Sequence, residues 1–73
     1  MRAINKDDFQ IITTPAGNVK VCWKHNKARL RLFRSDYNPL SRAHTYRDWL
    51  IKWYAENNYL INDDGQIKEV RND

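Results

Sequence analysis

The chain has 73 residues and a formal net charge of +4, with 41% hydrophobic and 30% charged residues. A chain of this length supports one small domain, residues 1–73, because it can bury only about 60% of the surface that its unfolded form exposes. The single cysteine excludes an internal disulfide, the N-terminus lacks the layout of a signal peptide, and no apolar run approaches the roughly 20 residues of a membrane span, so we expect a soluble cytoplasmic protein without a membrane partner.

The first predicted strand, residues 9–14, is rich in β-branched and aromatic side chains. A Pro-Ala-Gly-Asn segment with turn chemistry follows and leads into an alternating segment, residues 19–25. The register of this first hairpin stays open. A three-residue loop would bury Phe9 and Ile11, whereas a loop of two or four residues would bury Ile12 instead.

A second hairpin is predicted from the alternation of apolar and cationic side chains over residues 19–25 and 28–34. Asn26 and Lys27 would form a two-residue turn, although Lys27 is not the usual glycine, so a longer loop remains possible. On this register Trp23 pairs with Leu30 and Val21 with Leu32 on the apolar face, and Lys24 pairs with Arg29, Cys22 with Arg31 and Lys20 with Phe33 on the opposite face.

The opposite face of this hairpin is the strongest functional signal, because six cations and no acid lie between Asp8 and Asp36. Cations on an exposed strand also protect it from aggregation, but a merely solubilising surface normally mixes both signs. We therefore expect phosphate contacts from lysine and arginine, with Phe33 available to stack on an unpaired base. The predicted nucleic-acid-binding residues are Lys20, Lys24, Lys27, Arg29, Arg31, Phe33 and Arg34.

A helix is predicted over residues 46–57, after a connecting segment, residues 35–45, that contains Asn38-Pro39. Thr45 followed by Asp48 is a variant of the capping box that opens helices. The apolar residues at helical spacing, which we expect to form the core, are Tyr46, Trp49, Leu50, Trp53 and Tyr54. In an alternative interpretation Ile51, Tyr54 and Tyr59 form an exposed patch for a protein partner or a homodimer.

Residues 59–70 contain Asp63-Asp64-Gly65 between two short apolar segments, which predicts a terminal β-hairpin or one strand and a tail. The fold class is then α+β: a three-stranded antiparallel sheet packed on one helix in the C-terminal half, followed by a short hairpin or strand. In layout this is similar to plant AP2-type DNA-binding domains and to the arm-binding domains of tyrosine integrases, whose sheet enters the major groove. The likeness is one of layout, and no residue role is carried over from it.

Catalysis has little support, because His25, His44 and Cys22 are too few and too scattered to form a metal site or a nucleophilic triad. A nuclease site built from His44 with Arg42, Arg47 and Asp48 is a minor alternative. We therefore expect a non-enzymatic module without a cofactor that binds either DNA or RNA in a regulatory or accessory role. The second hypothesis is a small inhibitor or adaptor, of the type that phages and mobile elements encode, whose basic face docks on an acidic protein surface.

Overall fold

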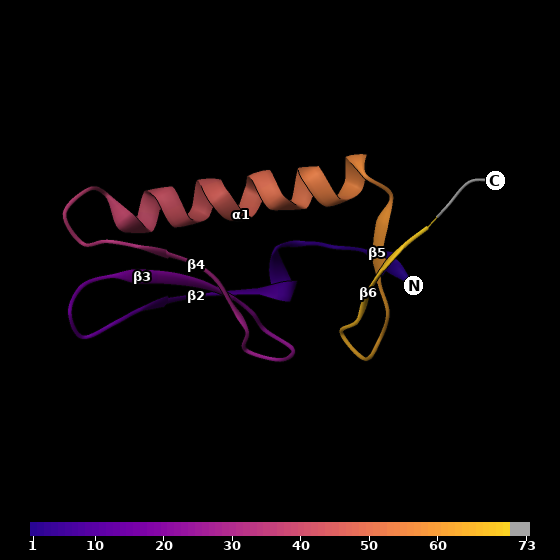
Figure 1. The fold of residues 1–73 in the computed structure, drawn as a ribbon, viewed down its shortest axis with the longest axis horizontal. Coiled ribbons are helices and arrows are strands. Elements are labelled where there is room, and N and C mark those ends of the chain that lie inside the picture. The colour runs from indigo at the N-terminus through magenta and orange to yellow at the C-terminus, as the bar shows by residue number, and fades with distance from the viewer. Residues whose placement is uncertain (71–73) are drawn as a thin grey trace.

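The computed structural model describes residues 1–70 and contains two three-stranded antiparallel sheets and one α-helix. In Figure 1 the helix lies lengthwise over the β2-β3-β4 sheet, and the β1-β5-β6 sheet stands at the C-terminal end of the helix, next to the N-terminus. The α+β class predicted from the sequence is thereby confirmed. The elements are β1 (Arg2–Ala3), a 3-10 turn (Lys6–Asp8), β2 (Phe9–Thr13), β3 (Val19–Trp23), β4 (Arg29–Phe33), α1 (Pro39–Glu56), β5 (Tyr59–Ile61) and β6 (Ile67–Glu69).

The β2–β3 hairpin has the three-residue loop that the sequence left as one of its alternatives. The N–H of Thr14 donates to the carbonyl of Asn18 at 2.7 Å, which leaves three residues in the loop. Gly17 closes it with a φ of +84°, a conformation that costs glycine little and other residues more. As expected for this loop length, Phe9 is buried, and Ile11 is half-buried opposite Val21.

The β3–β4 hairpin has a different register from the predicted one. Val19 pairs with Phe33 and Val21 with Arg31, and a bulge then shifts the pairing so that Cys22 lies opposite Arg29. The predicted pairs of Trp23 with Leu30 and of Val21 with Leu32 are therefore wrong.

The turn chemistry of the β3–β4 loop explains the shift. The Trp23 N–H donates to Ala28 O and the Lys27 N–H donates to Trp23 O, both at 2.9 Å. The loop is therefore four residues long, with Lys27 in the left-handed region at a φ of +59°. Because side chains alternate between the two faces of a strand, this change of register turns Arg31, Leu32 and Phe33 to the face opposite the predicted one. On the other side of the bulge, Leu30 keeps its predicted place against the core.

Helix α1 begins at Pro39, seven residues before the predicted start at Tyr46. Proline is favoured in the first turn because its fixed φ suits a helix and its missing N–H would have no helical partner there. Asn38 is the N-cap residue, and its carbonyl accepts the first helical hydrogen bond, from the Arg42 N–H at 3.1 Å. The predicted cap at Thr45 is wrong, whereas the predicted stop at Asn57-Asn58 is confirmed.

The core lies between α1 and the β2-β3-β4 sheet and continues to Ile61 of the second sheet. The helix contributes Ala43 and Leu50 as its fully buried residues, with Tyr46 half-buried beside them. Trp49 and Trp53, which we expected in the core, are 56% and 38% exposed. The buried stripe of the helix runs through Ala43, Tyr46, Leu50 and Tyr54, at spacings of three or four residues, and the two tryptophans lie beside this stripe. The buried apolar residues of this cluster are Ile4, Phe9, Val19, Val21, Phe33, Ala43, Leu50 and Ile61.

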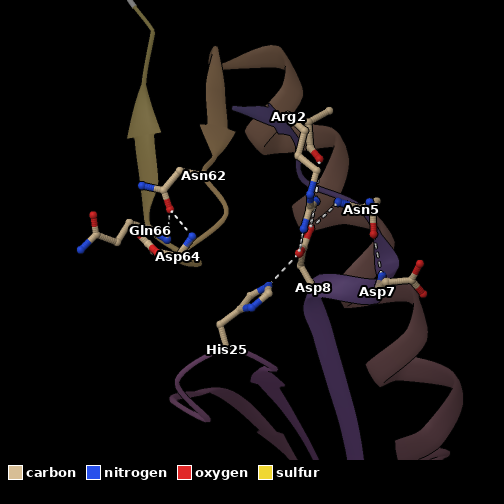
Figure 2. A network of polar contacts seen from close by, with 9 residues as sticks. Arg2, Asn5, Asp7, Asp8, His25, Asn62, Asp64 and Gln66 are labelled. Carbon is tan, nitrogen blue, oxygen red and sulfur yellow. Dashed lines mark hydrogen bonds and ion pairs between the residues drawn. The ribbon is translucent and has the colours of Figure 1, made fainter.

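A buried ionic network ties the N-terminal strand to the tip of the β3–β4 hairpin (Figure 2). The Asp8 side chain is 1% exposed and accepts two hydrogen bonds from the Arg2 guanidinium, at 2.5 and 2.8 Å. It also accepts the Asn5 N–H at 2.9 Å and lies 2.9 Å from His25 Nε2. Arg2 above all, with help from Asn5 and His25, holds the pKa of Asp8 well below its ordinary value of 3.8 despite burial.

The β5–β6 loop lies directly against this network. Gly65 has a φ of +82°, and a Cβ added to it would stand 2.6 Å from the Cβ of His25. The two hairpin tips therefore touch at a position that admits only glycine. Within residues 1–70 there is no helix with the length and apolar character needed to cross a membrane.

Candidate nucleic-acid interface

The six cations of the predicted interface do not share one face of the sheet. Lys24 and Lys27 lie in the β3–β4 loop, and Arg34 follows the end of β4. Lys20 faces away from the helix because it alternates with the buried residues Val19 and Val21. Arg29 faces the same way because it pairs with Cys22, which shares a face with Lys20. Arg31 lies on the helix side, opposite Val21, because of the register shift. The prediction of a single cationic face is therefore wrong.

The face of the sheet that points away from α1 is mixed in character. Lys20 stands there between Ile12 of β2 and Leu32 of β4, and Leu32 is 37% exposed. Cys22 also belongs to this face, but it is buried rather than exposed between lysines as expected. This face offers an anionic partner fewer cations and more apolar surface than the alternation indicated.

Phe33 is buried in contact with two guanidinium groups rather than exposed among the cations of an outer face. Its ring is 5% exposed and meets the Tyr46 ring edge-on at 5.7 Å. The guanidinium carbons of Arg31 and Arg42 lie 5.2 and 5.1 Å from its centroid. Arg31 also lies 5.3 Å from the Tyr46 centroid, and Arg42 lies 5.8 Å from that of Tyr37. These contacts fix the two arginines by cation–π attraction while Phe33 itself cannot reach a base.

An open groove of about 430 Å³ lies between β4 and the first half of α1. Tyr46 and Trp49 form its aromatic wall, with ring centroids 6.2 Å apart and planes only 23° from parallel. We call this feature the arginine-aromatic groove. Its lining residues are Arg31, Phe33, Ser41, Arg42, Thr45, Tyr46 and Trp49.

The two arginines of the groove form no ion pair with a carboxylate within residues 1–70. Among residues 1–70 the ion pairs are Arg2 with Asp8, His25 with Asp8, Arg47 with Asp48, and Lys52 with Glu56. Neither Arg31 nor Arg42 takes part in any of these pairs, and in the same range none of the six predicted cations does. An anion entering the groove would thus meet two guanidinium groups that no carboxylate of the described chain neutralises.

Sequence reasoning identified Arg31 and Phe33 but missed the groove as a unit. Arg42 and Trp49 come from the helix, and the predicted helix began after Arg42. The signal that could have found them is the Asn-Pro pair at positions 38 and 39, which marks a helix start as well as a turn. With that start, Arg42 and Trp49 lie seven residues apart on one helix face.

The alternative protein-binding patch is placed differently from its prediction. Ile51, Tyr54 and Tyr59 are half-buried and pack against the core rather than forming an exposed patch. Tyr54 meets Tyr59 edge-on at 5.5 Å, and burial raises the pKa of its hydroxyl above the ordinary value. Trp53, stacked on Tyr59 at 5.7 Å, is the exposed aromatic of this cluster.

The residues considered for a nuclease are not assembled into a catalytic arrangement. Arg47 donates to Asp48 at 3.1 Å, so the acid is already paired, and His44 is exposed on α1. Within the described part of the chain, no group of three or more His, Cys, Asp or Glu side chains could hold a metal ion.

A scan against models of protein families, a search of curated proteins and a search of solved structures each find no significant match to this chain.

Proposed function

We propose that this protein is a small non-enzymatic nucleic-acid-binding module with a regulatory or accessory role. The observation that carries the proposal is the pair Arg31 and Arg42, which both contact the Phe33 ring, with guanidinium carbons 5.2 and 5.1 Å from its centroid, and both line the arginine-aromatic groove. Both guanidinium groups lack a carboxylate partner within residues 1–70. Guanidinium groups bind phosphate through paired N–H donors, so a phosphate backbone is their natural partner.

The other predicted cations add to the attraction rather than to a common docking face. Lys24, Lys27 and Arg34 are exposed at the two ends of β4, whereas Lys20 and Arg29 look away from the groove. Each lysine or arginine that contacts a phosphate releases counterions, and binding therefore weakens as salt rises. We expect affinity that falls steeply with ionic strength.

Fluorescence anisotropy with a labelled duplex and a labelled single strand, at two salt concentrations, tests the proposal. Arg31→Gln and Arg42→Gln should each weaken binding about five- to tenfold and lower the salt slope by about one. Lys68→Gln in β6 removes the same charge outside the groove lining and is the matched control, with an expected change below about twofold. Negligible binding of both probes at low salt would end the proposal.

A second candidate is an inhibitor or adaptor that docks on an acidic protein surface. The observation that favours it is the exposure of large apolar side chains near the arginines, because aromatic residues and arginine are enriched at protein interfaces. These exposed residues of the loop and helix are Tyr37, Leu40 and Trp49.

A pull-down after nuclease treatment separates the two candidates. One stoichiometric protein that the wild type retains and the Arg31→Gln/Arg42→Gln double variant loses would favour the inhibitor or adaptor. In a parallel pull-down without nuclease treatment, recovery of nucleic acid and of no protein partner would favour the nucleic-acid-binding module.

A further inference from the structure

We propose that the arginine-aromatic groove binds single-stranded nucleic acid, with one unpaired base stacked on Trp49 and the adjoining phosphates held by Arg31 and Arg42. This inference rests on the proposed function and deepens it by naming the class of nucleic acid. The inferred ligand has an unpaired base with one accessible face, as found in single strands. DNA and RNA both qualify, because stacking on the base does not depend on the sugar.

Trp49 has the properties of a stacking platform. Its side chain is 56% exposed, although tryptophan is among the residues that gain most from burial. Tyr46 supports it from within the protein, with ring planes 23° from parallel. Tyr46 in turn meets the buried Phe33 ring. The indole is therefore supported by two further aromatic rings, and its exposed surface is available to a flat ligand.

Arg31 and Arg42 are oriented for phosphate before any ligand arrives. Each guanidinium lies over aromatic rings, a contact that uses the flat face and leaves N–H donors at the edges. Arg42 makes one long hydrogen bond, 3.5 Å, to the Tyr37 carbonyl. Since the aromatic contacts already restrict both side chains, less conformational entropy is lost when they bind phosphate.

The size of the groove and the charge around it favour a base flanked by phosphates. At about 430 Å³ the groove falls within the range of about 300–1,000 Å³ typical of pockets that hold small organic molecules. Its walls combine aromatic faces with two cations, which matches a nucleotide, apolar in its base and anionic in its phosphate.

A duplex fits this surface less well than a single strand. Paired bases stack on one another and present no free face to an aromatic side chain. Phe33 is too buried to act as a wedge between base pairs. The outward sheet face carries Lys20 and Arg29 but also Ile12 and Leu32, so it offers a duplex backbone only a sparse set of cations.

The experiment compares labelled probes of about 15 nucleotides, a length near the upper end of single-strand site sizes. They are a single strand, the matching duplex, and a single strand whose bases are all removed. Poly-glutamate serves as an anion without bases. We expect the intact single strand to bind about tenfold more tightly than the duplex or the abasic strand, and poly-glutamate to bind most weakly.

Three variants identify the stacking residue, each checked for folding by thermal melting. Trp49→Ala should lose about tenfold in affinity for the intact strand and nothing for the abasic strand, whereas Trp49→Phe should keep most of the affinity. Trp53→Ala is the matched control, because Trp53 is an exposed tryptophan of the same helix that does not line the groove. Its affinity should stay within about twofold of wild type.

The possible failures are distinguishable. Equal affinity for duplex and single strand, or an unchanged affinity in Trp49→Ala, overturns the stacking inference and leaves nucleic-acid binding intact. Poly-glutamate binding as tight as oligonucleotide binding overturns both in favour of an acidic protein partner. Failure of all probes to bind at low salt overturns the proposed function itself.

Discussion

Asp8 shows how much one residue can organise in a chain of this size. Its carboxylate is 1% exposed and joins the N-terminal strand, through Arg2, to the β3–β4 loop, through His25. A buried carboxylate is tolerated only when its lone pairs are satisfied, and here Arg2, Asn5 and His25 satisfy them. The network therefore fixes the relative positions of the two sheets.

The depressed pKa of Asp8 makes stability depend on acid. Below pH 3.8, the ordinary pKa, the unfolded chain takes up a proton at Asp8 while the folded chain does not. The free energy of unfolding that the ionised Asp8 contributes is therefore fully present above that pH and is lost as the pH falls below it. Asp8→Asn should lose about 2 kcal/mol at neutral pH, because the charged hydrogen bonds are weakened while the half-exposed Arg2 stays hydrated. Thermal unfolding followed by circular dichroism from pH 7 to about pH 2 checks this.

Asp7→Asn is the matched control, since Asp7 is the exposed neighbour whose side chain makes no ion pair within residues 1–70. Its melting temperature should follow the wild type at every pH. Wild type and Asp8→Asn curves that fall in parallel below pH 4 would contradict the assigned pKa.

A local sequence pattern predicts only part of the Asp8 network: Asn5 and Asp8 form a capping box on the 3-10 turn, whereas the contact of Asp8 with His25 follows no local pattern. Asp8 precedes a buried strand, and His25 lies in a loop that we expected only to face solvent. Their contact joins residues that are 17 apart in the chain. It depends on where the two hairpin tips meet, at Gly65, and that meeting is a tertiary feature.

At the scale of elements, the sequence predicted which segments are strands but not how the second pair aligns. In β3, Val19 and Val21 are buried on the predicted face, although Cys22 on the other face is buried as well. In β4, Leu32 competes with Phe33, which has the opposite parity, whereas the bulge lets Leu30 pack against the core together with Phe33. The observed register buries Phe33 against Tyr46 and leaves Leu32 37% exposed, so burial of the aromatic ring is favoured over burial of the leucine.

This competition gives a test by substitution. Phe33→Ala should destabilise the fold by about 3–5 kcal/mol, because it removes a buried ring and leaves a cavity beside Tyr46. Leu32→Ala should cost less than about 1 kcal/mol, since the side chain is largely in water already. Urea unfolding of both variants measures the difference. The opposite order of the two losses would restore the register expected from the sequence.

The helix shows a similar limit of local reasoning. Its apolar residues and its C-terminal end were predicted from spacing and from the Asn-Asn pair. Its first two turns were not, because Asn38-Pro39 is compatible with a turn and with a helix start alike. Arg42 lies in these two turns, so only half of the candidate site was predicted. Arg31 was named as a binding residue from the strand pattern, whereas its pairing with Arg42 became visible only in the fold.

At the scale of the whole molecule, the arginine-aromatic groove and the acidic β5–β6 loop lie at opposite ends of the long axis. The chain is elongated, with extents of 46 × 22 × 14 Å. Figure 1 places the first half of α1 at one end and the β5–β6 hairpin at the other. The groove cations belong to the first end, and the acidic loop residues Asp63 and Asp64 belong to the second. The sequence predicted an acidic C-terminal third, but the distance of its loop from Arg31 and Arg42 depends on the fold.

This separation predicts how far the acidic loop influences binding. At about 0.15 M salt the screening length is about 8 Å, so neutralising Asp63 and Asp64 together should raise affinity for a single strand by less than about twofold. At about 0.01 M salt the screening length grows to about 30 Å, and the same double change to asparagine should raise affinity several-fold. Both side chains are exposed, so the loop keeps its Asn62 and Gly65 hydrogen bonds. Anisotropy titrations at both salt concentrations measure the effect. A gain at 0.15 M salt as large as the loss caused by Arg31→Gln would show that the acidic loop lies beside the bound strand, so that the strand would not be confined to the arginine-aromatic groove.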